Sequence, residues 1–135
     1  DGRIVNATGP AITAQCIRVP VSDGHMAAVF VAFDKKPSRD EILSAWRSYS
    51  GKAQALKLPS APTPFLNYFE EENRPQTKLD RDVGNGQGIS IGRLRPDAVF
   101  DWRFVALSHN TVRGAAGGAV LTAELLKAEG YLTAK

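Results

Sequence analysis

The sequence has little that could cross-link the chain, anchor it in a membrane or attract a strongly charged partner. Its one cysteine excludes an intrachain disulfide and is typical of a reducing compartment. No apolar run approaches the roughly 20 residues of a membrane-spanning helix, and the first residues lack the layout of a signal peptide. We therefore expect a cytoplasmic protein with no membrane contact. Because the chain begins with Asp1 and not with methionine, we expect a processed product or an excised domain.

Charge and motifs exclude several further classes. The net charge is only +3, and basic and acidic residues are interleaved between Arg74 and Arg103. Interleaved charges are typical of a solvated or ion-paired surface and argue against a nucleic-acid site, although the basic excess would suit a small anionic ligand. No His, Cys, Asp or Glu residues have metal-ligand spacing, so we predict no metal site. The P-loop, the dinucleotide-binding glycine motif and the Gly-x-Ser-x-Gly motif are also absent.

What is present is the composition of one folded domain, with 135 residues that are 43% hydrophobic and 23% charged. Residues 11–21 are rich in β-branched side chains and predict a strand. A turn signal at residues 22–24 leads to an apolar run over residues 25–33, which predicts a strand covered on both faces. The first part of the chain therefore predicts two strands of a sheet.

A helix is expected next, because Ser38 and Glu41 have the spacing of a capping box. Gly51 is a plausible end of this helix. Its buried face would carry four apolar side chains at helical spacing: Ile42, Leu43, Trp46 and Tyr49.

The rest of the chain predicts more strands and a final helix. Residues 58–75 are rich in proline and aromatic side chains and indicate an irregular connection with a short strand, followed by a loop over residues 74–88. Residues 89–94 and 99–107 predict two strands joined by a turn at residues 95–97. A helix over residues 111–129, ended by Gly130, begins with unusually small side chains that would allow close packing against another backbone. The pattern indicates an α+β fold.

Two residues near the start could carry chemistry. His25 follows a glycine turn at the mouth of a strand, where it could act as a general acid and base, but position alone favours a hydrogen-bonded strand end. Arg18 lies in an apolar segment and needs a partner, either a ligand carboxylate or a structural acid such as Asp23. We reject Cys16 as a nucleophile, because its expected position within a strand is typical of a small buried hydrophobe.

Two further residues precede the final helix. Asn110 and Thr111 could cap this helix, or Asn110 could pair with a ligand amide beside the helix end. We interpret His109 as structural.

Four segments carry a resemblance to a known family. They are residues 18–25 (Arg-Val-Pro-Val-Ser-Asp-Gly-His), 74–80 (Arg-Pro-Gln-Thr-Lys-Leu-Asp), 92–95 (Gly-Arg-Leu-Arg) and 108–117 (Ser-His-Asn-Thr-Val-Arg-Gly-Ala-Ala-Gly). In this order they resemble the C-terminal half of aspartate-β-semialdehyde dehydrogenase, in the form found in fungi and archaea. Several segments in one order are more specific than any single motif.

The resemblance implies an enzyme of lysine, threonine and methionine biosynthesis, which reduces β-aspartyl phosphate with NADPH to aspartate semialdehyde and phosphate. In such enzymes a cysteine forms a thioester with the substrate, and the cofactor reduces it. By this resemblance His25 is the acid and base partner of that cysteine, Arg18 binds the substrate carboxylate, and Asn110 lies near the nicotinamide carboxamide. The family's cysteine segment and its dinucleotide fingerprint have no match here, so we expect residues 1–135 alone to be inactive.

The resemblance also implies a mixed, largely antiparallel sheet with helices on one face, as in the C-terminal domain of glyceraldehyde-3-phosphate dehydrogenase. Residues 1–110 would form a substrate-binding and dimerisation domain, which pairs through its sheet in a homodimer. Residues 111–135 would form a helix that docks on a cofactor-binding domain. The small-residue face of that helix should then be exposed, or covered by a neighbouring chain.

Other functions remain open at this point. The chain could be a non-catalytic dimerisation module on the same scaffold, or part of a related acyl-phosphate or acyl-thioester reductase. Arg18 and His25 together favour an enzyme, because dimerisation needs neither. In a tight hairpin, however, His25 would face Val21, on the opposite side of the sheet from Arg18. A bulge at Pro20 or a wider turn would then be needed to bring the two side chains to one cleft.

Overall fold

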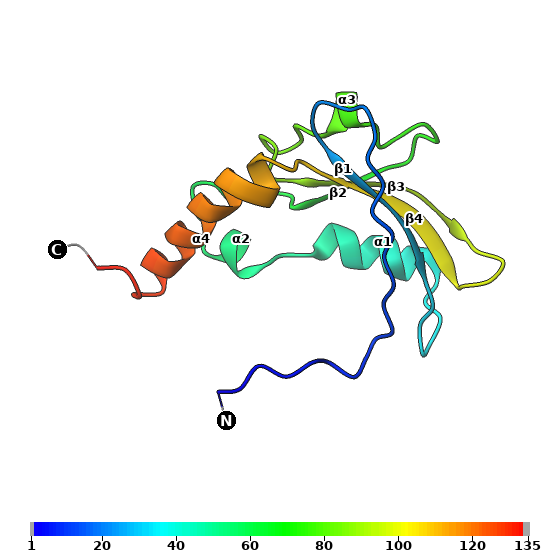
Figure 1. Ribbon diagram of the computed structural model, residues 1–135, viewed down its shortest axis with the longest axis horizontal. Coiled ribbons are helices and arrows are strands. Elements are labelled where there is room, and N and C mark those ends of the chain that lie inside the picture. The colour runs from blue at the N-terminus through cyan, green and yellow to red at the C-terminus, as the bar shows by residue number, and fades with distance from the viewer. Residues whose placement is uncertain (1, 134–135) are drawn as a thin grey trace.

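The computed structural model describes residues 2–133 and shows one four-stranded sheet with helices (Figure 1). The strand order is β1-β4-β3-β2, with β1 and β3 antiparallel to β4 and β2 parallel to β3. The strands are β1 (His25–Val31), β2 (Leu66–Phe69), β3 (Ile89–Pro96) and β4 (Trp102–Ser108). The helices are α1 (Arg39–Ser48), α2 (Lys52–Ala55), α3 (Thr77–Asp80), the π-helix η1 (Val112–Ala116) and α4 (Gly117–Ala128). The predicted α+β class is confirmed.

The predicted helix after Ser38 is α1, and its capping box is present. The Ser38 hydroxyl accepts a hydrogen bond from the Glu41 amide at 3.2 Å, and the Glu41 carboxylate accepts one from the Ser38 amide at 2.7 Å. The bond from the Ser38 amide, with one that the Ser38 hydroxyl donates to the same carboxylate at 2.8 Å, lowers the pKa of Glu41 below its usual value. The chain thus enters α1 at a defined residue, below the sheet in Figure 1.

The core lies between α1 and the sheet. Ile42 and Leu43 of α1 are buried with Leu94 of β3 and Trp102 of β4. Further aromatic side chains pack around this core, and the rings of Trp46 and Phe104 meet edge to face at 5.1 Å. Tyr49 is 50% exposed, contrary to prediction: it is the C-cap of α1, and its ring lies against Phe65, with centroids 5.7 Å apart, outside this core.

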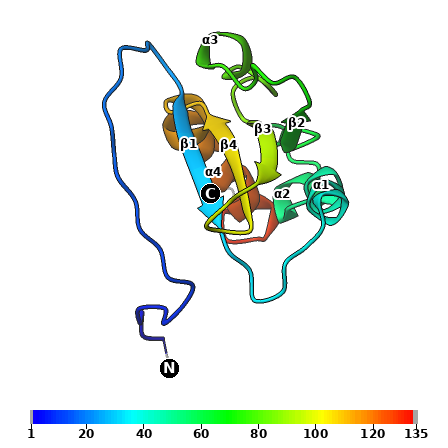
Figure 2. The same ribbon diagram turned by 90° about the vertical axis from the view of Figure 1, so that its right-hand side faces the viewer.

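The predicted strand over residues 11–21 is wrong for this structure. This segment has no regular secondary structure and is exposed throughout. Figure 2 shows it separated from the sheet, on the side opposite α1. A β-strand is stable only when a neighbouring strand pairs with its backbone groups, and no part of residues 2–133 pairs with this one. Cys16 is therefore exposed, not buried in a strand as expected.

Strand β1 forms where the apolar run predicts it, but the expectation that both its faces are covered is wrong. Met26 is 49% exposed and Phe30 is 53% exposed. The reason is topological, because β1 is an edge strand of the sheet and only β4 pairs with it. One edge and much apolar surface of β1 are left uncovered by residues 2–133.

The predicted strands after residue 88 are present with shifted ends. The turn between them lies at residues 97–101, where the Asp97 carboxylate accepts hydrogen bonds from the amides of Val99 and Phe100, both at 2.9 Å. These hydrogen bonds lower the pKa of Asp97. The strand register shifts between Gly92 and Arg95, which marks a bulge that the alternation pattern did not predict.

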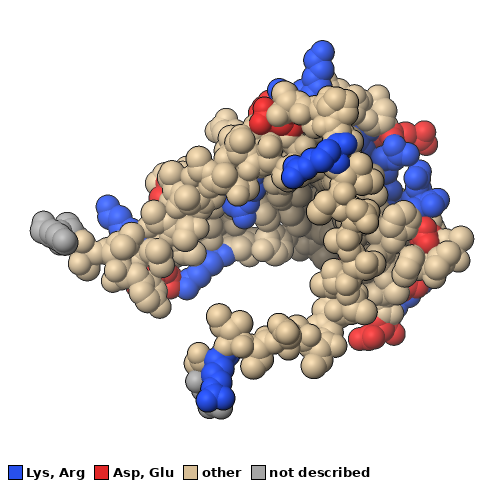
Figure 3. Space-filling view, viewed as in Figure 1, with Lys and Arg blue, Asp and Glu red and all other residues tan. Residues whose placement is uncertain are grey.

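The interleaved charges form ion pairs, as the sequence pattern predicted. Arg81 lies 3.6 Å from Asp82, Arg103 lies 3.4 Å from Asp97, and Arg74 pairs with Asp80. On the face shown in Figure 3, Lys and Arg side chains are scattered and interspersed with Asp and Glu.

Candidate functional site

The candidate site begins at His25, the first residue of β1. His25 is exposed and lies opposite Ser108, the last residue of β4. The preceding Gly24 is buried, with φ +107°, and a Cβ there would lie 3.1 Å from side-chain atoms of both Leu107 and Thr77. Only glycine suits this combination of backbone angle and close contact. The turn before His25 thus packs between the end of β4 and the start of α3.

Asn110 reaches the same turn from the other end of the sequence. Its side-chain oxygen Oδ1 accepts a hydrogen bond from the Gly24 amide at 2.9 Å, although the two residues are 86 positions apart. The β1–β4 pairing makes this contact possible, because it places Ser108 beside His25. No hydrogen bond within residues 2–133 uses the side-chain nitrogen of Asn110. The N–H groups of this side-chain amide can therefore donate to a carbonyl oxygen of a ligand.

His109 has the structural role expected from the sequence. Its ring is buried, and Nδ1 accepts hydrogen bonds from the amides of Thr111 and Val112, both at 3.3 Å. Since Nδ1 accepts, the proton of the neutral ring lies on Nε2, which faces Asp82 Oδ1 at 3.6 Å. His109, rather than Asn110, caps the start of the final helix.

Arg18 is not brought to this site. It is exposed within the irregular N-terminal segment, and no hydrogen bond or ion pair among residues 2–133 involves its side chain, including with Asp23. The expected conflict of sheet faces does not arise, because residues 11–21 are not a strand and form no hairpin with β1.

Asp80 is a buried acid that pattern reasoning missed. It is 1% exposed, and both carboxylate oxygens accept from Arg74 Nε, at 2.9 and 2.8 Å. Burial raises the pKa of Asp80, but the hydrogen bonds from Arg74 and the Gln76 amide, with the Arg74 charge, outweigh it and hold the pKa below its usual value. The pair joins the first and last residues of segment 74–80, and nothing in local periodicity could reveal it.

The Arg74–Asp80 pair also explains the glycine of segment 92–95. A Cβ at Gly92 would clash with the Arg74 carbonyl oxygen. Gly92 thus allows the backbone at Arg74 to lie directly on β3. Because α3 follows at once, and the Thr77 side chain would lie 3.1 Å from a Cβ at Gly24, this packing supports the turn before His25.

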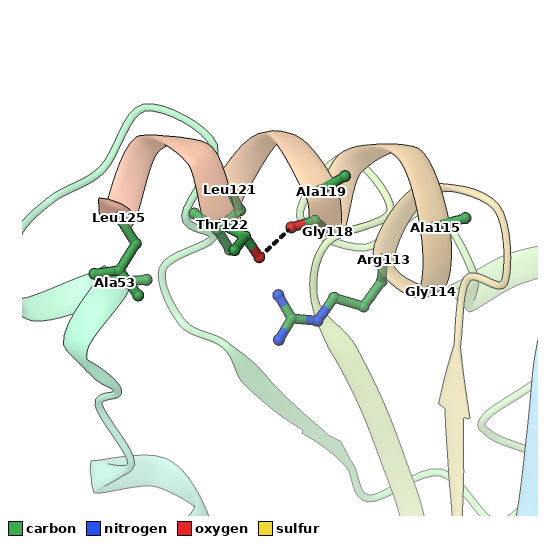
Figure 4. Close-up of a pocket in the computed structure, with 9 residues that line it drawn as sticks. All are labelled: Ala53, Arg113, Gly114, Ala115, Gly118, Ala119, Leu121, Thr122 and Leu125. Carbon is green, nitrogen blue, oxygen red and sulfur yellow. Dashed lines mark hydrogen bonds between the residues drawn. The ribbon is translucent and has the colours of Figure 1, made fainter. Parts of the chain in front are cut away.

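The final helix is present, with a π-helical first turn and an end at Gly130, where φ is +81°. It projects from the sheet in Figure 1, and Leu121 is the one residue of α4 that is buried within the described chain. A hollow of about 450 Å³ lies along this helix. Figure 4 shows the residues that line it, which are mostly small, together with Arg113, Leu121 and Leu125. Of the small-residue face, Gly114, Ala115 and Ala116 are exposed in the described chain, as expected, whereas Gly117 is half-buried.

Part of the small-residue stretch packs against another segment of the same chain. A Cβ at Gly117 would lie 2.5 Å from the side-chain nitrogen of Gln87, a buried residue that sequence reasoning did not single out. The Gln87 oxygen Oε1 is buried without a hydrogen-bond partner. Gly117 thus allows the loop before β3 to pack closely against the helix start.

The described residues contain neither a candidate metal site nor a membrane-spanning helix. Within residues 2–133, no three His, Cys, Asp or Glu side chains are grouped so that they could hold a metal ion. None of the helices there has the length and hydropathy required to span a bilayer.

Comparison with known proteins identifies the family. Residues 2–113 match the semialdehyde dehydrogenase dimerisation domain. The chain belongs to this family. The resemblance found in segments 18–25, 74–80, 92–95 and 108–117 is therefore confirmed.

Among relatives of this dimerisation domain, the aspartate-semialdehyde dehydrogenase of Aspergillus fumigatus is 47% identical over 129 residues. That of Archaeoglobus fulgidus is 44% identical over 126 residues. The matches cover 92% and 93% of this chain but only 36% of each relative. The chain thus spans little more than a third of the length of these oxidoreductases.

Solved structures show the same fold. The aspartate semialdehyde dehydrogenase of Candida albicans, whose crystal structure was determined with NADP, is 39% identical with a TM-score of 0.75. The match covers 84% of this chain and 32% of that chain. Aspartate semialdehyde dehydrogenase II from Vibrio cholerae, at 24% identity and a TM-score of 0.63, supports the fold alone.

Proposed function

We propose that this chain is the C-terminal catalytic and dimerisation part of an NADP-dependent aspartate-semialdehyde dehydrogenase. The full-length protein would reduce β-aspartyl phosphate with NADPH to aspartate semialdehyde and phosphate, through a cysteine thioester. The observation that carries this proposal is the family match over residues 2–113, together with the Gly24–His25 turn held by Asn110. A cytoplasmic location fits such a biosynthetic enzyme.

In this proposal His25 is the acid–base residue. Its ring is exposed at the start of β1 while the backbone beside it is held by Gly24, so it can meet a group contributed by another part of the protein. A histidine can accept and return a proton near neutral pH, as the formation and reduction of a thioester require.

Arg18 is proposed to bind the substrate carboxylate. Its guanidinium is exposed and has no partner among residues 2–133, which leaves its paired N–H groups free for an anionic ligand. The N-terminal segment would have to be ordered against the rest of the protein to bring Arg18 to His25. We expect the missing part of the enzyme to provide the surface on which it orders.

Asn110 is the residue of this chain proposed to contact NADP. Its side-chain amide nitrogen is a suitable donor for the oxygen of a nicotinamide carboxamide, since Gly24 bonds only to Oδ1. The cofactor, when bound, supplies the hydride. The other contacts with it would come from a dinucleotide-binding domain, and the nucleophilic cysteine would also lie outside this sequence. Residues 1–135 alone are therefore proposed to be inactive.

The remaining surfaces are proposed to serve assembly. Residues 1–110 would bind substrate and pair with a second copy through the sheet, where the apolar side chains of β1 are half exposed. Residues 111–135 would dock on the cofactor domain through the hollow along α4, whose small side chains allow a close approach. Residues 134–135 lie outside the described residues.

Kinetics of the full-length enzyme test these roles. We expect His25→Ala to lower kcat by at least about 100-fold with little change in KM, because a positioned acid–base group contributes on this scale. Arg18→Ala should raise KM for aspartyl phosphate by about 10- to 100-fold, which is the worth of charge-assisted hydrogen bonds. The matched control is Arg3→Ala, in the same exposed segment, which should behave as wild type. Normal kinetics of either site variant would refute the role of that residue.

A further inference from the structure

We propose that Asn110 is a positioning residue for His25, and that it links the start of the final helix to the acid–base group. The proposal rests on the proposed role of His25 and assigns Asn110 a task besides a cofactor contact. It is carried by the hydrogen bond from the Gly24 amide to Asn110 Oδ1, at 2.9 Å.

Gly24 determines where His25 stands. Its position is limited by contacts on two sides, because even a single added carbon would meet Leu107 and Thr77 at 3.1 Å. Its amide is the last backbone N–H before His25, and Asn110 is its acceptor. Without that acceptor, a buried N–H would be left unsatisfied and the turn would gain freedom to move.

Asn110 is itself held from both sides. Before it, Ser108 is paired with His25 across β1 and β4. After it, the amides of Thr111 and Val112 are bound by the ring of His109, whose other nitrogen faces Asp82. The side chain of Asn110 is therefore presented by a short, hydrogen-bonded junction between β4 and η1.

The junction has a functional consequence. The helix that follows the junction is proposed to dock on the cofactor domain. On the other side, Asn110 of the junction holds Gly24, the residue directly before His25. A shift of the helix start would move Asn110 and, through Gly24, the backbone that orients His25. Docking of the cofactor domain and orientation of the acid–base group are thus mechanically linked in this chain.

Two substitutions in the full-length enzyme separate positioning from cofactor contact. Asn110→Ala removes both ends of the amide. Asn110→Asp keeps an oxygen that can accept from Gly24 but replaces the nitrogen that could donate to NADP. Asn73→Ala, at an exposed position for which no side-chain hydrogen bond is formed within residues 2–133, is the matched control.

The first measurement is hydrogen exchange of the cofactor-free enzyme, read by mass spectrometry on the peptide that contains Gly24. We expect Asn110→Ala to speed exchange of this amide by up to about tenfold, which corresponds to the loss of one hydrogen bond. Asn110→Asp and Asn73→Ala should exchange as wild type. Unchanged exchange in Asn110→Ala would overturn the proposal.

The second measurement is steady-state kinetics. We expect both variants to raise KM for NADPH, because both lose the side-chain nitrogen proposed to donate to the cofactor, but only Asn110→Ala to lower kcat, by about tenfold, while Asn110→Asp keeps most of kcat. If both variants raise KM for NADPH equally but leave kcat unchanged, Asn110 serves the cofactor alone and the proposal is wrong. Normal turnover of His25→Ala would refute the proposed function, a result distinct from the exchange measurement.

Discussion

The substitution Asp80→Asn should be among the most damaging single-atom changes in this chain. The Asp80 carboxylate is buried; its two oxygens share the single N–H of Arg74 Nε, and it also accepts from Arg74 Nη2 and from the Gln76 amide at 2.6 Å. Asparagine has the same shape but no charge and one oxygen fewer. It would leave the Arg74 guanidinium without its anion and place an amide N–H₂ against N–H donors.

The size of the effect follows from this geometry. Removal of one member of a buried ion pair costs about 3–5 kcal/mol. The lower end applies here, because the Arg74 side chain is 24% exposed and its guanidinium lies 4.6 Å from the Phe69 ring centroid, so it can be partly solvated and stabilised after the change. We therefore expect a loss of about 3 kcal/mol in the free energy of unfolding.

Urea unfolding of the chain at neutral pH is a suitable assay, with tryptophan fluorescence as the probe because Trp102 is 6% exposed in the core. With a slope of about 2 kcal/mol/M, the midpoint should fall by about 1.5 M. The control is Asp34→Asn at an exposed position, which should stay within about 0.5 kcal/mol of wild type. A midpoint for Asp80→Asn that matches this control would refute the reasoning.

The pH dependence gives a second check. Since the pKa of Asp80 is lower in the folded state than in the unfolded state, the unfolded chain binds more protons as the pH falls. The stabilisation is therefore complete above the unfolded pKa, near 3.9, and is lost as the pH falls through the folded pKa. The difference between wild type and Asp80→Asn should shrink over this window. A difference that grew on acidification would contradict the assigned direction.

Two further predictions concern the fold. Gly92→Ala should destabilise the chain by about 1–3 kcal/mol, because its Cβ would overlap the Arg74 carbonyl oxygen; Gly9→Ala, where nothing lies within 4 Å, is the control in the same urea assay. A neutral Gly92→Ala would mean that the Arg74 backbone does not lie on β3. Ser38→Ala should cost about 1 kcal/mol by removing the cap of α1, measured by thermal unfolding against the exposed Ser50→Ala. Equal melting temperatures for these two serine variants would show that the capping box adds nothing.

Much of the local structure could be predicted because its causes lie within a few residues. The capping box of α1 joins positions 38 and 41, and Gly130 ends the last helix through its own backbone angle. The strand at residues 25–31 follows from a continuous apolar run. Hydrophobic and capping signals of this kind need no knowledge of the rest of the chain.

Other features could not be predicted, because they depend on what lies beside a segment. Residues 11–21 have the composition of a strand, yet they remain irregular because no described strand pairs with them. The apolar run of β1 suggested burial on both faces, but its place at the sheet edge leaves it half exposed. Composition measures the tendency to pair or to be buried, and topology decides whether a partner is there.

For the candidate site, the sequence by itself determined which residue types were present and, through four ordered segments, which family they belong to. Only the tertiary structure decided that the Gly24 amide meets Asn110, that His109 caps the helix, and that Arg18 stands apart. The physical reason is that the pairing of β1 with β4 brings together Gly24 and Asn110, which are 86 positions apart, and such a contact leaves no signal in either segment alone.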